Sequence, residues 1–173
     1  MEGQITNQQK HLNYREQNER LIKAIKNQFY LEAIFIEYSI IEDRTESILR
    51  YTNRFPKQSS FVSLDKKISL IEKVSEEKAS VANQYFDVEF LEKIRDWKNM
   101  RNAIIHALMK RNVCTNDLLE TALAGRQLVK DLCRISTNYK RKLLRMGLLS
   151  EEIQDEKTNK KEKFLCPQIL RPE

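Results

Sequence analysis

Three residues whose side chains could act together on one ligand are Arg101, Asn102 and His106, in the segment Arg-Asn-Ala-Ile-Ile-His. The segment lies in a run from Phe90 to Leu108 that contains no Gly or Pro and has apolar residues at helical spacing. That spacing calls for an apolar residue at position 101, where the chain has an arginine instead. A guanidinium keeps its charge and is costly to bury without a partner, so this break in the pattern indicates a site.

The spacing of these residues fixes how a helix would present them. Asn102 and His106 are four residues apart and therefore share one helix face. Arg101 and His106 are five apart, about 140° around the helix axis, so they would flank a shared groove. The helix could offer a permanent cation, an amide and a titratable imidazole to one anionic ligand.

The order Arg-Asn-x-x-x-His, late in a helical chain, resembles the HEPN (higher eukaryotes and prokaryotes nucleotide-binding) superfamily. Its signature is an Arg, four to six residues, and then a His, often with Asn directly after the Arg. The resemblance covers roughly residues 13 to 146. It also rests on the order of the other segments, in which Tyr38-Ser39-Ile40-Ile41-Glu42 and Leu64-Asp65-Lys66-Lys67-Ile68 precede the motif and one long helix follows it.

The resemblance implies a metal-independent endoribonuclease that acts as a homodimer, with the motif helices of two subunits facing each other across one cleft. His106 would act as general base or acid, and Arg101 would stabilise charge on the phosphoryl oxygens. Asn102 would orient the imidazole or hold the arginine, and Glu42, on the earlier helix, would be their acidic partner. The implied setting is a toxin–antitoxin or phage-defence system, with an antitoxin or regulatory protein as a possible further partner. Some family toxins carry a modified Tyr two residues after the His; Leu108 stands there, which argues against that form of control.

Each of these residues also has a purely structural interpretation. Arg101 could form an ion pair with Glu42 or another helix acid, His106 could be a partly buried histidine with satisfied hydrogen bonds, and Glu42 could be a solvated acid. Two other functions stay open as well. One is a non-catalytic HEPN module that binds RNA or a nucleotide, or bridges protein partners. The other is a plain helical interaction protein.

A basic cluster near the end of the predicted last helix is a candidate RNA-binding surface; it consists of Lys140, Arg141, Lys142 and Arg145. Contacts of such side chains with phosphates would be salt-sensitive and independent of sequence. Cations also favour the C-terminal ends of helices, so a solvated helix end explains the same pattern.

The composition favours an all-α fold in one domain. The chain has 173 residues with only 3 Gly and 3 Pro, 32% charged residues and a net charge of +6. We expect an up-down helical bundle of about five to six helices, HEPN-like, with a long C-terminal helix. No signal core, membrane span or metal-ligand pattern is visible, so we expect a cytoplasmic protein with no membrane contact, whose activity needs no metal or cofactor. Cys114, Cys133 and Cys166 are too few and too widely spaced for a disulfide framework.

The chain divides into a flexible N-terminus (1–12), a helical domain (13–148) and a mobile or extended tail (149–173). Helices are predicted over 14–26, 28–53, 63–77, 87–110 and from 115 or 116 to a stop at Gly147, and residues 78–86 could be a short helix or a loop. The second helix should place on its inner side Leu31, Ile34, Phe35, Tyr38, Ile41, Thr45, Ile48 and Leu49. The last helix should present a heptad-like seam to a bundle or to a partner helix, consisting of Leu118, Ala122, Gly125, Val129, Leu132, Ser136, Tyr139 and Leu143. Gly125 costs helix stability on this seam, which indicates a close backbone approach.

Overall fold

The computed structural model describes residues 7–56, 61–77, 80–108, 110 and 112–149. These residues form α1 (Asn7–Lys26), α2 (Tyr30–Tyr51), α3 (Leu64–Glu76), the short 3-10 helix η1 (Val81–Gln84), α4 (Val88–Ala107) and α5 (Thr115–Arg145). No strand occurs among them, which confirms the all-α prediction. The predicted tail lies outside the described residues from position 150 onward.

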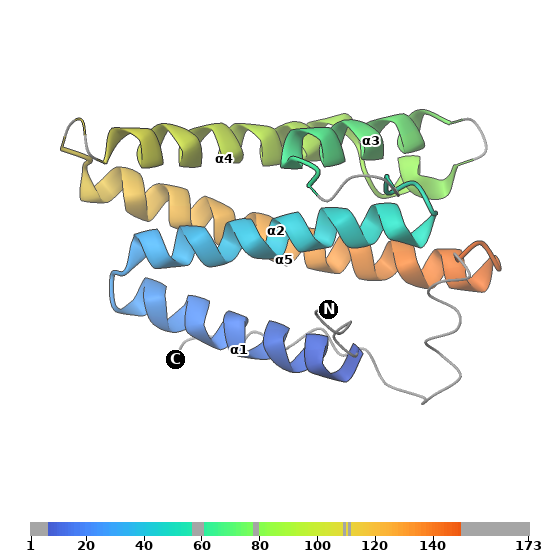
Figure 1. Cartoon of the computed structure of the whole chain (residues 1–173), viewed down its shortest axis with the longest axis horizontal. Coiled ribbons are helices and arrows are strands. Elements are labelled where there is room, and N and C mark those ends of the chain that lie inside the picture. Colours follow the sequence, from blue (N-terminus) through green and yellow to red (C-terminus); the bar gives the residue numbers. More distant parts are fainter. Residues whose placement is uncertain (1–6, 57–60, 78–79, 109, 111, 150–173) are drawn as a thin grey trace.

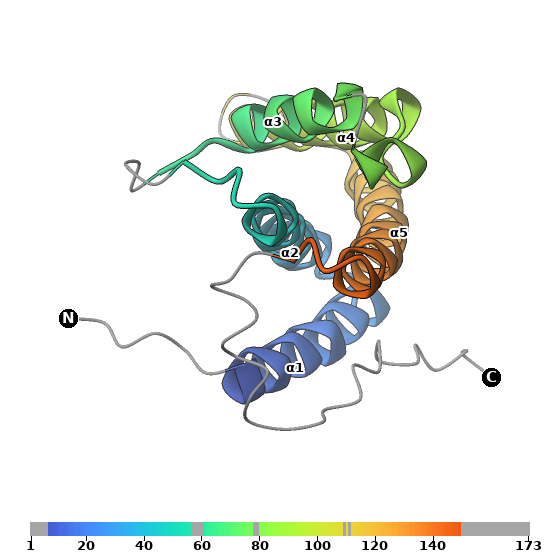
Figure 2. The ribbon, with the colours of Figure 1, turned by 90° about the vertical axis from the view of Figure 1, so that its right-hand side faces the viewer.

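Helices α2 and α5 pack against each other at the centre of the bundle (Figure 1). Helix α1 lies on one side of this pair, and α3 and α4 lie together on the other side (Figure 2). Helix α3 runs in the same direction as α2 (Figure 1). Helix α4 then runs antiparallel to α3, and α5 returns.

Several helix ends form where local sequence chemistry predicts them. The side chains of Ser63 and Asp87 cap α3 and α4 by accepting backbone N–H bonds, from Lys66 at 3.4 Å and from Phe90 at 2.7 Å. Gly147 adopts a φ of 69° after α5, a left-handed conformation that glycine takes without strain. The helix starts predicted at positions 63 and 87 and the stop predicted at Gly147 are therefore confirmed.

Two boundaries differ from the sequence prediction. Helix α1 begins at Asn7, inside the segment expected to be flexible. Lys10 forms an ion pair with Asp43 of α2 at 2.9 Å, which ties this first part of α1 to the bundle. At the other end, Leu149 is buried in the core, although the loose tail was expected to begin there. The folded unit is therefore longer at both ends than predicted.

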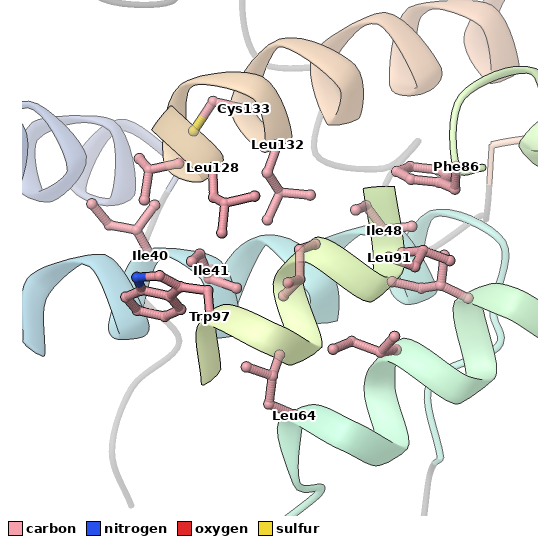
Figure 3. Packing of buried hydrophobic residues seen from close by; sticks show 14 of the residues in the cluster. Ile40, Ile41, Ile48, Leu64, Phe86, Leu91, Trp97, Leu128, Leu132 and Cys133 are labelled. Atoms are coloured by element: carbon pink, nitrogen blue, oxygen red, sulfur yellow. The ribbon is translucent and has the colours of Figure 1, made fainter. Parts of the chain in front are cut away.

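The core lies where α2, α4 and α5 meet. Ile40 and Ile41 of α2, Trp97 of α4, and Leu128 and Leu132 of α5 converge there (Figure 3). Except for Leu118, which is partly buried, every residue of the predicted seam on α5 is buried inside this chain. The seam on α5 therefore packs inside this chain's own bundle and is not available to a helix of a partner protein.

Phe35 and Glu37 correct the predicted inner face of α2. Phe35 was placed inside but is 48% exposed, and Glu37 was not placed on the inner face but is fully buried. Neither carboxyl oxygen of Glu37 has a hydrogen-bond partner in the described structure. Burial raises the pKa of Glu37 to about 9, with Arg126 opposing this shift, so the carboxyl is uncharged at neutral pH.

The predicted close approach at Gly125 is confirmed. A Cβ atom at this position would lie 2.2 Å from Oε2 of Glu37 and 2.7 Å from the ring of Trp97. The indole of Trp97 is held in place because its Nε1 donates to the carbonyl of Thr121 at 2.9 Å. Only glycine leaves room for both side chains.

We therefore expect Gly125→Ala to destabilise the protein by about 2 kcal/mol, in the range measured for overpacked cores. Gly147→Ala is the matched control, because apart from its chain neighbours no atom of the described residues lies within 4 Å of the added methyl group, and only the backbone conformation is strained. Urea denaturation followed by circular dichroism measures both. An equal or smaller loss of stability in Gly125→Ala would show that the core adapts to the methyl group.

Candidate functional site

The motif residues lie on a part of α4 that α3 does not cover. Helix α4 has 20 residues and α3 has 13. The two are joined by ion pairs of Arg95 with Glu72 and of Lys98 with Asp65, the second residue of α3. Beyond Lys98, α4 continues over the first half of α2 without α3 beside it (Figure 1). The difference in length thus leaves the motif at the surface.

Arg101 is held by aromatic rings and by its neighbour in sequence. Its guanidinium carbon lies 4.4 Å from the ring centre of Tyr38 and 5.3 Å from that of Phe35, both on α2. Its Nη1 donates to Oδ1 of Asn102 at 2.9 Å. Its Nε is buried with no hydrogen-bond partner in the described structure. The guanidinium of Arg101 is thus held in position, but its Nε–H has no hydrogen-bond acceptor among the described residues.

Lysines engage the two carboxylates, Glu42 and Asp65, that affect the pKa of Tyr38 beside Arg101. Glu42 lies 3.5 Å from Nζ of Lys67, which is only 4% exposed, and Asp65 pairs with Lys98. No carboxylate of the described residues forms an ion pair with Arg101. The structural interpretation, in which Arg101 forms an ion pair with Glu42, is therefore wrong. Glu42 pairs with Lys67 instead.

The ring of Tyr38 contacts Arg101, and the Tyr38 hydroxyl is also affected by the charge of Glu42. Burial raises the pKa of the Tyr38 hydroxyl, the Glu42 carboxylate raises it further, and Arg101 opposes both. Glu42 therefore acts on the site through the field at Tyr38. The hydroxyl stays protonated at neutral pH and is available as a hydrogen-bond donor.

His106 is exposed near the C-terminal end of α4. It makes no hydrogen bond with any described residue, so the interpretation as a satisfied, partly buried histidine does not hold. Asn102 uses its amide oxygen for Arg101 and makes no hydrogen bond with His106. Of the two roles expected for Asn102, this arrangement fits the one of holding the arginine.

The structure does not bring the basic cluster to the motif. Lys140, Arg141, Lys142 and Arg145 lie at the opposite end of the bundle from the motif (Figure 1). Position 140 is 15 residues beyond Gly125, which faces the motif helix, and this corresponds to roughly 22 Å along α5. The ammonium of Lys140 lies 5.2 Å from the ring centre of Tyr51. Within one chain, the two positively charged regions cannot contact the same phosphate.

Three further features of the described residues concern metal ligands, membrane spans and cysteines. No group of three or more His, Cys, Asp or Glu side chains gathers there as metal ligands would. None of the described helices combines the length and apolarity needed to span a bilayer. Of the cysteines, Cys114 is exposed and Cys133 is buried, both as thiols, while Cys166 lies outside the described residues.

Comparison of the chain with protein-family models, curated proteins and solved structures finds no match. The site therefore has to be interpreted from its own residues. Sequence reasoning missed the aromatic contacts of Phe35 and the buried Lys67 that binds Glu42. The one available signal was the position of Phe35 at the edge of the apolar stripe on α2.

Proposed function

We propose that this chain is a metal-independent endoribonuclease of HEPN type whose site is built on Arg101, Asn102 and His106. The observation that carries the proposal is the state of Arg101. It is a fixed cation, oriented by Tyr38 and Asn102, and no carboxylate among the described residues forms an ion pair with it. A cation of this kind is suited to a phosphate, because the guanidinium offers several fixed N–H donors to phosphoryl oxygens.

The reaction uses the ribose of the substrate as its own nucleophile. The 2′-hydroxyl oxygen forms a bond to the adjacent phosphorus while the bond from phosphorus to the 5′-oxygen breaks. One imidazole takes the proton of the 2′-hydroxyl, and a protonated imidazole gives a proton to the leaving 5′-oxygen. Arg101 stabilises the negative charge on the phosphoryl oxygens. The products are a 2′,3′-cyclic phosphate and a 5′-hydroxyl.

A homodimer through the motif helix would supply the second imidazole. Asn99 and Ala103 lie on the same face of α4 as His106, and Met100 borders this face, about 120° around the axis from His106; all four residues are exposed in this chain. Met100 is 44% exposed, which leaves an apolar side chain available to a second subunit beside this face. Two copies facing each other here would place two His106 side chains near one phosphodiester. Glu42 remains, in this proposal, a residue that acts on the site through Tyr38.

The proposal is tested by incubating the purified protein with single-stranded RNA in buffer that contains EDTA. We expect strand cleavage, 3′ fragments that carry a 5′-hydroxyl, and 5′ fragments that end in a 2′,3′-cyclic phosphate. RNA with 2′-O-methyl groups is the matched control and should stay intact, because it lacks the nucleophile. Cleavage of the methylated RNA, or products with 5′-phosphates, would contradict the mechanism.

The second candidate is a non-catalytic module that binds RNA or a nucleotide. It is favoured because no residue of the described ranges makes a hydrogen bond that orients His106, whereas a proton-transferring imidazole is usually held by a partner. This candidate predicts that the same RNA is bound and recovered uncleaved, and that Arg101→Ala weakens the binding. The two candidates therefore differ in one measured quantity, the fraction of RNA cleaved.

A further inference from the structure

We infer that Phe35 is a stacking platform for an unpaired nucleobase next to the phosphate that Arg101 binds. The inference rests on the proposed function and adds a substrate feature, namely that the nucleotide at the site must be single-stranded. It also assigns a binding role to a residue outside the motif. Aromatic side chains stack on bases of any identity, so the contact selects unpaired RNA without selecting its sequence.

The geometry of the three side chains on this surface supports the assignment. Arg101 lies against the ring of Tyr38 at 4.4 Å and so covers part of that ring. Phe35 lies one turn earlier on α2, 5.3 Å from the guanidinium, and is 48% exposed. A phosphate bound by Arg101 and a base resting on Phe35 would thus be close enough to belong to one nucleotide.

The charges around Phe35 favour an anionic ligand. Glu42 and Asp65, the carboxylates that act on Tyr38, are each paired with a lysine. Arg101 contributes a positive charge that no described carboxylate compensates. A ligand that combines a planar apolar group with a negative charge fits this surface, and a nucleotide within an RNA strand has both.

A second subunit is the competing occupant of the exposed ring, since apolar side chains are often covered by partners. It is disfavoured here because the exposed ring lies beside Arg101, a cation that pairs with no carboxylate in the described part of the chain, whereas subunit interfaces are depleted of charged residues at their centres. The exposed Met100 on α4 offers an uncharged surface to a partner instead.

The test measures binding of single-stranded 2′-O-methyl RNA, which the proposed reaction cannot cleave, by fluorescence anisotropy. A series of oligonucleotides carries one abasic site at each position in turn. For the unaltered protein, we expect one abasic position to weaken binding by about 5- to 100-fold. Phe35→Ala should lose the same factor on intact RNA and show no further loss at that abasic position. Phe35→Trp should bind at least as tightly as the unaltered protein.

Phe29→Ala is the matched control, because Phe29 is another exposed aromatic residue, 60% accessible, at the start of the same helix. It should bind intact and abasic RNA like the unaltered protein. Binding that depends on Arg101 but is unchanged in Phe35→Ala would overturn the stacking role and leave the proposed function standing. A complete lack of RNA affinity in the unaltered protein would overturn both.

Sedimentation of the same variants separates stacking from subunit contact. If Phe35 stacks on a base, Phe35→Ala keeps the oligomeric state of the unaltered protein. If the variant becomes monomeric and loses affinity equally for every abasic position, Phe35 belongs to an interface between subunits and the inference is overturned.

Discussion

Replacing His106 with alanine is expected to lower the rate of RNA cleavage by about 10²–10⁴-fold, the usual contribution of a general acid–base group. An imidazole can both accept and donate a proton, which is the role that the proposed mechanism gives to His106. Replacing Arg101 with alanine should cost about 10²–10³-fold, because the developing charge on the phosphoryl oxygens loses its cation. Single-turnover cleavage of labelled RNA measures both rates.

The controls for this pair use the same residue types elsewhere in the chain. His11→Ala and Arg15→Ala change exposed residues on α1, far from the motif in sequence, and should cleave RNA at the rate of the unaltered protein. Arg101→Lys keeps a positive charge but loses the flat, forked group that fits a phosphate, so it should recover only part of the rate. Unchanged cleavage in both alanine variants would contradict the proposed mechanism.

Replacing Glu37 with glutamine is expected to stabilise the protein, and the gain should grow with pH. In the folded chain the pKa of Glu37 is about 9, against an ordinary value of 4.5, so the native state must keep a proton that the unfolded state releases. This lowers the free energy of unfolding as pH rises between these two values, by about 1.4 kcal/mol for each pH unit. At pH 7 the accumulated cost is about 3 kcal/mol.

Glutamine has nearly the same shape as the uncharged acid and does not ionise, so Glu37→Gln removes this cost and leaves the packing in place. The difference in stability should be near zero at pH 4 to 5, about 3 kcal/mol at pH 7, and larger at pH 8.5. In thermal denaturation, the gain at pH 7 corresponds to a rise of about 6–12 °C in Tm for a chain of this size. Urea denaturation across this pH range measures the difference directly.

The control for this prediction is Glu32→Gln on the same helix. Glu32 forms a surface ion pair with Arg20 and its side chain is 38% exposed, so its replacement should change stability by less than about 1 kcal/mol. A stability gain of Glu37→Gln that is the same at pH 5 and pH 8 would show that the carboxyl does not retain its proton in the folded chain. A loss of stability at every pH would mean that the native acid has a favourable interaction that the amide lacks.

Glu37 lies directly beneath the candidate site. The next residue, Tyr38, holds Arg101, and Trp97, which packs against Gly125 beside Glu37, is one turn before Arg101 on α4. A costly buried acid in this position is a local departure from ordinary core composition, and such departures often accompany function. The Glu37→Gln variant should therefore also be assayed for RNA cleavage, with its stability gain as the reference.

The sequence alone determined the helical class and most of the helix ends. Scarcity of Gly and Pro and the spacing of apolar residues sufficed for the class, because an α-helix repeats at 3.6 residues whatever surrounds it. Ser63, Asp87 and Gly147 marked helix boundaries through purely local bonds or backbone preference. The motif Arg101–His106 was visible for a similar reason, since neighbours on one helix are fixed by spacing.

The tertiary structure decided which side of each helix became core. Glu37 is three residues after Ile34 and four before Ile41, so its place on the inner face was written in the sequence, but its charge argued against burial. Phe35 is apolar and yet lies outside, on the first half of α2, where α3 does not run beside the helix (Figure 1). Helical periodicity predicts which face of a helix is the most apolar. Whether a residue on that face is buried depends on which other helix lies beside it at that point along the bundle.

The partners of the charged side chains were decided in the same way. Glu42 could have paired with Arg101, but the parallel course of α3 beside α2 brought Lys67 to it instead, and Asp65 was taken by Lys98. With these two pairings in place, Arg101 has no ion-pair partner among the carboxylates that the structure describes. Residue spacing predicts which side chains lie close together on one helix. Contacts between helices depend on the lengths, directions and connections of the helices, and the spacing of residues within one helix does not encode these.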